Sequence, residues 1–103
     1  STSCLGIFDT KVKRFNDAEL VPHMGWNSIK NLRSSLFNAL EEGDDTYFVH
    51  SYYAEISRDT SAICEYSVVF SAALEKQNFY ATQFHPEKSA GIGEQILNNF
   101  LKL

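Results

Sequence analysis

The sequence has no run of basic residues, and its 9 lysines and arginines are outnumbered by 13 aspartates and glutamates. The formal net charge is −4 over 103 residues. A protein that follows a nucleic-acid backbone concentrates positive charge along one face or one segment. The missing basic run therefore argues against nucleic acid as a partner.

Long apolar stretches are also missing. None approaches the roughly 20 residues that a helix needs to cross a bilayer, and no signal-like apolar segment follows Ser1. Cysteine is scarce, because Cys4 and Cys64 are the only two and lie far apart in apolar segments. Without a secretory signal they are typical of reduced, packed thiols. We therefore expect a cytoplasmic protein with no membrane contact.

Helical periodicity is limited to two segments. The first runs from Ser34 or Ser35 to Gly43, with a serine as the N-cap and the glycine as the stop. The second starts near Ser89 and carries one apolar stripe to the end of the chain. The sequence therefore predicts two helices.

Strand-like segments are more numerous, and residues 75–78 are typical of a hairpin turn. The segment 9–15 is interpreted as a loop or a short edge strand. After residue 47 the strands follow one another without helices, which favours an antiparallel meander from 47 to 84 over a doubly wound sheet. The expected fold class is α/β, the second half of a larger sheet of mixed, largely antiparallel strands plus two helices. The predicted strands are residues 4–8, 23–29, 47–54, 64–66, 68–73 and 79–84.

The segment His85-Pro86-Glu87 carries the clearest chemistry. Proline pushes the backbone of the preceding residue into the extended region, where residues two apart point to the same side. Glu87 can then accept a hydrogen bond from one ring nitrogen of His85 and leave the other free as a base. This is the base-and-orienter half of a nucleophilic triad. On spacing alone, an exposed polar pair at a strand end explains the same residues.

The surroundings of this pair resemble the class I (triad) glutamine amidotransferases. Residues 83–89 (Gln-Phe-His-Pro-Glu-Lys-Ser) are similar to the family's motif before its last helix, and residues 93–103 are similar to that helix. Residues 21–27 (Val-Pro-His-Met-Gly-Trp-Asn) and 47–52 (Tyr-Phe-Val-His-Ser-Tyr) resemble one branch of the family. That branch comprises the glutaminase subunits that serve a cyclase in histidine biosynthesis. The resemblance runs from about Leu5 to Leu103.

The resemblance implies a mechanism. A cysteine thiolate would attack the side-chain amide of glutamine and release ammonia, and the γ-glutamyl thioester would then be hydrolysed to glutamate. His85 would move the protons and Glu87 would orient it. The backbone around Ser51 and Tyr52 would hold the amino-acid head group of glutamine. No cofactor and no metal are implied.

The resemblance also implies a partner. In this branch of the family, ammonia passes to a (β/α)₈-barrel cyclase subunit that makes imidazole glycerol phosphate. The two subunits form a heterodimer, and the mouth of the glutaminase site faces the barrel. The residues expected at this interface are Lys88, Trp26, Asn27 and Tyr47.

Neither cysteine fits the nucleophile. The family places it in a Gly-x-Cys-x-Gly turn between a strand and a helix, and neither Cys4 nor Cys64 has glycines on both sides. The family's oxyanion loop has no counterpart here either. We therefore expect residues 1–103 to be the C-terminal half of an amidotransferase domain, inactive alone. We expect an unpaired strand near residues 5–8 to make this half self-associate.

Three alternatives remain open. Another triad amidotransferase component, of the anthranilate or aminodeoxychorismate synthase type, would share His85 and Glu87 but differ in residues 21–27. A non-catalytic interaction domain could retain the histidine motif as a relic. Zinc could bind the histidines, but no pair has a ligand spacing such as His-x-x-x-His. His23 and His50 are better interpreted as structural, hydrogen-bonding residues.

Overall fold

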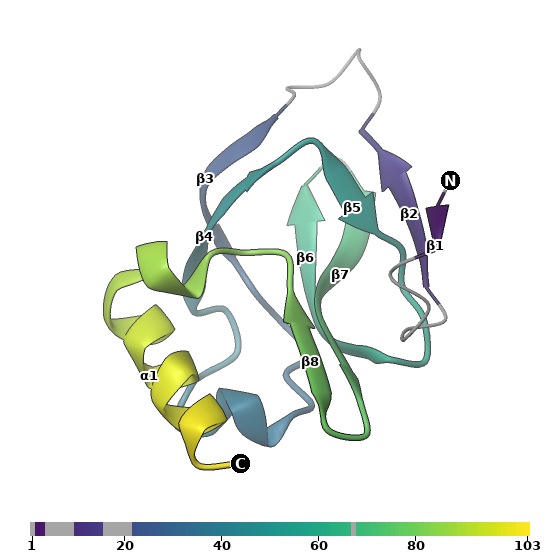
Figure 1. The fold of residues 1–103 in the computed structure, drawn as a ribbon. Helices are drawn as coiled ribbons and strands as arrows, with labels where there is room; N and C mark the ends of the chain where they lie inside the picture. The colour runs from purple at the N-terminus through teal and green to yellow at the C-terminus, as the bar shows by residue number, and fades with distance from the viewer. Residues whose placement is uncertain (1, 4–9, 16–21, 67) are drawn as a thin grey trace.

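A computed structural model describes residues 2–3, 10–15, 22–66 and 68–103, and most of the elements in it are antiparallel strands (Figure 1). Within these residues a six-stranded sheet has the order β1-β2-β5-β7-β6, with β8 also paired to β7, and β3 and β4 form a separate two-stranded ribbon. The six strands of the sheet are β1 (Thr2–Ser3), β2 (Lys11–Arg14), β5 (Tyr52–Ala54), β6 (Thr60–Tyr66), β7 (Val68–Lys76) and β8 (Phe79–Thr82). The ribbon strands are β3 (His23–Ser28) and β4 (Asp45–His50).

Strand β7 is the centre of the sheet. It pairs with β6 on one side, while β5 pairs with it at Ser71 and β8 at residues 73–76 on the other. Its residues from Phe70 to Leu74 are buried on both faces, and three of the five are alanine or serine. The predicted hairpin turn is confirmed, since Gln77 and Asn78 join β7 to β8 and Gln77 has a φ of 56°.

The ribbon of β3 and β4 buries one face and exposes the other. Its register runs from the pair His23–His50 to the pair Ser28–Asp45. Thr46 and Phe48 are fully buried, whereas the alternate positions face outward, as expected for a strand with one face on the core. The predicted strand at 23–29 is therefore confirmed.

The single strand predicted at 47–54 is wrong in one respect. The chain leaves the ribbon at Ser51 and enters the six-stranded sheet, so β4 and β5 belong to different sheets. The backbone amide of Phe15 donates to the Ser51 carbonyl at 3.0 Å at this crossing. The predicted meander is also incomplete, because β5 pairs with β2 and β7 rather than with β6, the next strand in the chain.

The first predicted helix, from Ser34 or Ser35 to Gly43, is only one 3₁₀ turn, η1 (Ser35–Phe37). Its predicted cap is confirmed, because the Ser34 hydroxyl accepts from the Leu36 amide at 3.0 Å. The turn then ends at Asn38, whose ψ of 138° is not helical.

The reason lies in the second helix, α1 (Ala90–Leu101), whose position was predicted. The buried Asn99 side chain donates to the carbonyls of Leu36 and Asn38 at 2.9 and 2.7 Å. An α-helix would use the Leu36 carbonyl internally, four residues on. A tertiary partner takes it instead, so the helical pattern stops after one turn.

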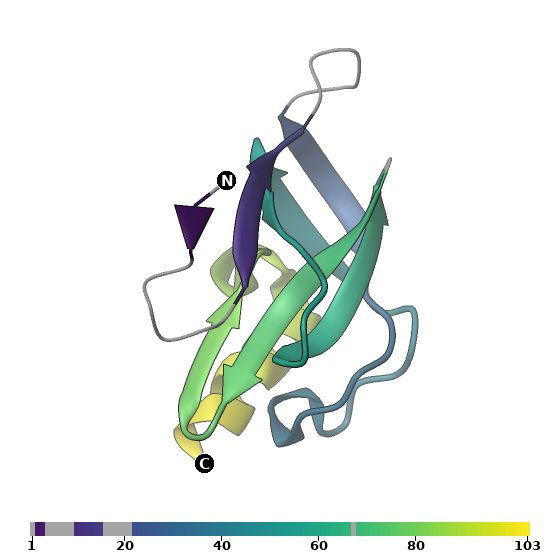
Figure 2. The same cartoon turned by 90° about the vertical axis from the view of Figure 1, so that its right-hand side faces the viewer.

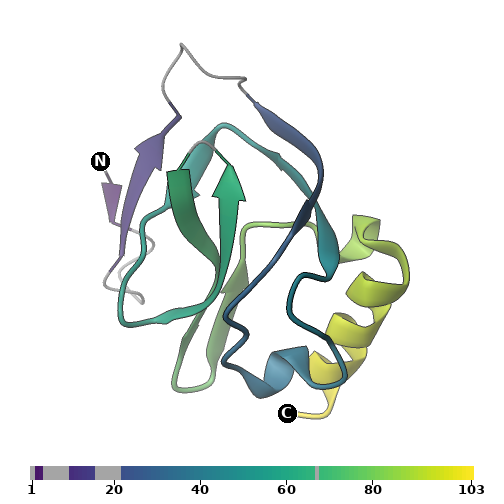
Figure 3. The same cartoon turned by 180° about the vertical axis from the view of Figure 1, so that it is seen from behind.

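Helix α1 lies at the end of the molecule opposite β1 and β2 (Figures 1 and 3). The β7–β8 hairpin reaches it (Figure 2), where Tyr80 meets Phe100 edge to face at 5.9 Å. Gly93 allows the helix to approach the preceding element, η2 (Pro86–Lys88), because a Cβ there would overlap the Pro86 carbonyl.

The main core lies between the ribbon, the sheet and α1. Phe48 contacts Phe70 and Phe84 edge to face, each at 5.9 Å. In the part of the chain that is described, no helix has the length and apolar character to span a membrane. The predicted strand at residues 4–8, which includes Cys4, lies outside the described residues.

Candidate active site

The chain reaches the candidate site at the junction of the two sheets. After β8, Gln83 donates its backbone amide to the Ala72 carbonyl of β7 at 2.8 Å. Phe84 is buried in the core at 2% exposure. His85 donates its backbone amide to the Tyr47 carbonyl of β4, also at 2.8 Å. The backbone of residues 83–85 is thus held from both sheets, by Gln83 on the six-stranded sheet and by His85 on the ribbon.

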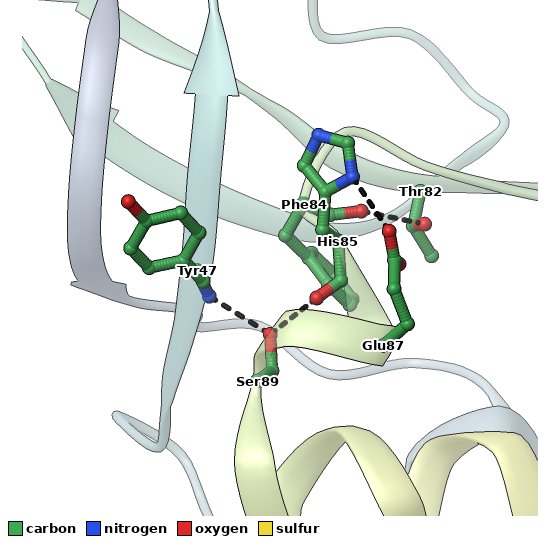
Figure 4. A network of polar contacts seen from close by, with 6 residues as sticks. All are labelled: Tyr47, Thr82, Phe84, His85, Glu87 and Ser89. Atoms are coloured by element: carbon green, nitrogen blue, oxygen red, sulfur yellow. Dashed lines mark hydrogen bonds and ion pairs between the residues drawn. The ribbon is translucent and has the colours of Figure 1, made fainter.

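The next three residues form the 3₁₀ turn η2. His85 is its N-cap and has extended dihedrals, φ −101° and ψ 100°, as expected before a proline. The turn returns Glu87 to the histidine, and Nδ1 of His85 lies 3.0 Å from Oε2 of Glu87 (Figure 4). The expected neighbours therefore meet, although through a tight turn rather than along an extended strand.

This contact sets the roles of the two ring nitrogens. A carboxylate can only accept, so Nδ1 of His85 carries the proton and Nε2 of the neutral ring is left with its lone pair. Nε2 points away from Glu87 in Figure 4. A hydrogen bond from its own backbone amide, followed by the bond from His85, lowers the pKa of the Glu87 carboxyl. The side chains are 38% and 61% exposed, so this pair is open to a reactant.

Ser89 holds the pair in place, and the sequence analysis assigned it no role beyond the start of the last helix. Its side chain is fully buried. The hydroxyl donates to the His85 carbonyl at 2.7 Å and accepts from the Tyr47 amide at 2.9 Å (Figure 4). It makes no side-chain hydrogen bond that caps α1. In the sequence, only its position directly after His-Pro-Glu-Lys could have indicated this role.

Ser51 and Tyr52, predicted to bind substrate, form the crossing between β4 and β5. The Tyr52 side chain is 56% exposed. It lines a hollow of about 270 Å³ together with Thr82 and Gln83. Gln83 is two residues before His85 in the chain, and the hollow itself is lined by neither Ser51 nor His85.

The predicted interface residues fall into two groups. Trp26 and Tyr47 are cross-strand neighbours on the outer face of the ribbon, with ring centroids 5.8 Å apart at 75°. Trp26 is 53% exposed, and Lys88 on η2 is exposed as well. Asn27 belongs to the opposite face of the ribbon, where its side-chain amide lies 3.4 Å from Nε2 of His23 and from the Glu65 carbonyl.

Cys64 is not a reactive thiol. It is 1% exposed, and burial raises its pKa to about 12. A thiolate nucleophile needs the opposite environment, exposed and electropositive. The prediction that Cys64 is a packed thiol is confirmed, and among the described residues it is a free cysteine.

Metal ligands do not converge in the described ranges. No group of three or more histidine, cysteine, aspartate or glutamate side chains there is arranged to hold an ion. His23 and His50 instead bond to each other, with Nδ1 of His23 2.9 Å from Nε2 of His50. Their interpretation as hydrogen-bonding residues is confirmed.

Comparison with known proteins adds independent information. The family model described as glutamine amidotransferase class-I matches residues 6–103. Imidazole glycerol phosphate synthase subunit HisH of Bacteroides fragilis is 57% identical over 106 residues, which cover 100% of this chain and 54% of that protein. The proteins of the same name from Bacteroides thetaiotaomicron and Shewanella loihica are 53% and 50% identical, over 97% of this chain and 53% and 45% of their own lengths. The chain thus spans about half the length of these curated relatives.

Proposed function

This chain belongs to the class-I glutamine amidotransferase family, and from that premise we propose that it carries the base half of a glutaminase site. His85 is the general base and acid, and Glu87 orients it. The protein that contains the chain is a glutaminase subunit of imidazole glycerol phosphate synthase, which supplies ammonia for histidine biosynthesis. The observation that supports this most directly is the 3.0 Å bond from Nδ1 of His85 to Glu87, with Nε2 left to act.

The chemistry follows from this pair. Neutral Nε2 of His85 takes the proton of the cysteine thiol, and the thiolate attacks the side-chain carbonyl of glutamine to form a sulfur–carbon bond. The carbon–nitrogen bond then breaks as Nε2–H of His85 gives this proton to the leaving ammonia. Neutral Nε2 then takes a proton from water while the oxygen attacks the thioester, and the thiol leaves with glutamate as the product. Glu87 stabilises the transient imidazolium in both steps.

The nucleophile belongs to a part of the family domain that residues 1–103 do not supply. Cys64 is excluded by burial and by its raised pKa, and Cys4 is not flanked by glycines. We propose that residues 1–103 are the C-terminal half of the domain, and their coverage of about half of each relative supports a partial domain. The buried free thiol of Cys64 fits a reducing location, the cytoplasm.

Glutamine lies along the hollow between Tyr52 and Gln83, with its head group against the backbone of Ser51 and Tyr52. In this proposal the side-chain amide of glutamine faces His85. The reaction requires no metal and no organic cofactor, because the thiolate, the base and the orienting carboxylate account for every bond that forms or breaks.

The partner is a (β/α)₈-barrel cyclase subunit that receives the ammonia. Its docking face includes the outer face of the ribbon, with Trp26 and Tyr47, and the exposed cation of Lys88. Tyr47 connects this face to the base, because its backbone bonds to both His85 and Ser89. Asn27 is the neighbour of Trp26 on β3 and lies on the opposite face of the ribbon, so it contributes indirectly, by holding β3 through its contacts with His23 and the Glu65 carbonyl.

The test is glutamate formation from glutamine by the protein that contains this chain, mixed with the cyclase of the same organism. Wild-type protein should release glutamate, and His85→Asn should abolish the release. Residues 1–103 alone should release none even with excess cyclase, and light scattering should show that they self-associate. Absence of glutamate from the wild-type complex, or full activity in His85→Asn, would refute the assignment.

A further inference from the structure

Two histidines that the proposed reaction does not use are joined in a short chain of hydrogen bonds. His23 on β3 and His50 on β4 are cross-strand neighbours. Nδ1 of His23 lies 2.9 Å from Nε2 of His50, and Nδ1 of His50 lies 2.7 Å from the Tyr52 carbonyl. At the other end, the side-chain amide of Asn27 lies 3.4 Å from Nε2 of His23.

The chemistry of these groups allows one direction of donation. A carbonyl oxygen only accepts, so Nδ1 of His50 carries a proton and its Nε2, in the neutral ring, accepts. Nδ1 of His23 must then donate, which leaves Nε2 of His23 as the acceptor for the Asn27 amide. If His50 were charged, His23 would have to donate from Nε2 toward the Asn27 amide, which is also a donor. Both rings are therefore neutral and each has a fixed tautomer.

The surroundings keep the pair neutral and rigid. His23 is 3% exposed and lies between two aromatic rings, Tyr66 at 3.9 Å and Phe48 at 4.8 Å. Burial and the neighbouring His50 lower the pKa of His23 to about 4. Burial also lowers the pKa of His50, against the effect of its bond to Tyr52, and nearby His85 lowers it further.

We propose that His23 and His50 are positioning residues that set the conformation of the Ser51–Tyr52 crossing. The chain changes sheets there within one residue, and the Tyr52 side chain is mostly exposed, so packing does not hold it. Backbone pairing and hydrogen bonds do so instead: Tyr52 is paired with Arg14 of β2, the Ser51 carbonyl accepts from the Phe15 amide, and the Tyr52 carbonyl accepts from His50. The histidine pair thereby shapes the backbone that contacts the amino-acid head group of the substrate, an inference that rests on the proposed function for the identity of that substrate.

Kinetics of the protein that contains this chain, in complex with its cyclase, separate positioning from a structural role. His50→Phe keeps the ring and removes the donor to Tyr52, so KM for glutamine should rise about tenfold, the effect of one lost hydrogen bond, with a smaller change in kcat. His50→Asn places an amide nitrogen near the former Nδ1 and should restore most of the affinity. A purely structural role would lower kcat and soluble yield in both variants while KM stayed at the wild-type value, and that result would overturn the proposal.

A second measurement does not depend on activity. In the same protein labelled with ¹⁵N-histidine, NMR at pH 7 should show both His23 and His50 as neutral rings protonated at Nδ1, assigned with the variants His23→Asn and His50→Asn. A ring of His50 protonated at Nε2 alone would overturn the inference whatever the enzyme does. If glutamine is not hydrolysed but both tautomers are as stated, the proposed function fails and the hydrogen-bonded chain stands.

Discussion

The buried hydroxyl of Ser89 donates to the carbonyl oxygen of His85 at 2.7 Å, so the residue before α1 holds the backbone of the candidate base. The hydroxyl oxygen of Ser89 also accepts from the Tyr47 amide. Three elements therefore meet at one buried hydroxyl: the segment after β8, the ribbon strand β4 and the start of α1.

Replacement of Ser89 by alanine removes both bonds and leaves a buried carbonyl and a buried amide without this partner. Each unsatisfied group costs about 1–3 kcal/mol, so the free energy of unfolding should fall by an amount in that range or above. Turnover should fall as well, because the His85 backbone is no longer fixed. Ser35→Ala, at an exposed serine of η1, is the matched control and should leave denaturation unchanged. Equal denaturation curves for Ser89→Ala and wild type would contradict this role.

His85 and Glu87 should differ in their effects on glutaminase turnover. His85→Asn removes the proton carrier and should lower kcat by about 10²–10⁴-fold. Glu87→Gln should be milder. The Glu87 side chain is mostly exposed, and the side-chain oxygen of the introduced Gln can still accept from Nδ1 of His85. Steady-state glutamate formation measures both. A greater loss in Glu87→Gln than in His85→Asn would reverse the assigned roles.

The lowered pKa of His23 predicts a dependence of stability on pH. The unfolded chain binds a proton at His23 below its ordinary pKa of 6.5, whereas the folded chain does so only near 4. Between these pH values the unfolded state holds more protons than the folded state. The contribution of neutral His23 to the free energy of unfolding is therefore fully present above pH 6.5 and is lost as the pH falls toward 4. The loss amounts to at most about 3 kcal/mol.

Chemical denaturation of wild type and His23→Asn between pH 7 and pH 4.5 tests this prediction. The carboxylates titrate in both proteins, so the difference between the two curves isolates His23. That difference should shrink as the pH falls, because only the wild type must keep a buried imidazole neutral. A constant difference over the whole range would show that His23 is not the titrating group.

Lys88 should couple the glutaminase to its partner. It is exposed on η2, one residue after Glu87, and is free of any ion pair within the described part of the chain. Lys88→Ala should change the ratio of glutamine hydrolysed to cyclase product formed more than it changes folding. If Lys88 lies at the rim of the interface, mainly the association rate will change; if it is buried in a pair there, docking will weaken by about 2–5 kcal/mol. Lys102→Ala, at the end of α1, is the control, and wild-type values for both affinity and stoichiometry would remove Lys88 from the interface.

Local patterns in the sequence were sufficient for part of this structure. The two runs on either side of Ser67, the turn at Gln77 and the apolar stripe of the last helix each depend on neighbours a few residues away. The pairing of His85 with Glu87 is equally local, since Pro86 lies between them and restricts the backbone. These features were therefore predicted.

The remaining features depend on partners distant in sequence. Residues 47–54 have strand character throughout, and only the pairing of β4 with β3 and of β5 with β2 and β7 divides them at Ser51. The helical pattern after Ser34 ends because Asn99, more than 60 residues later, takes the carbonyls of that turn. The hydrogen bonds between Ser89 and Tyr47 and between His23 and His50 also join residues distant in sequence. A buried polar group must be satisfied wherever the fold brings a partner to it, and that choice is made by the tertiary structure and not by the local sequence.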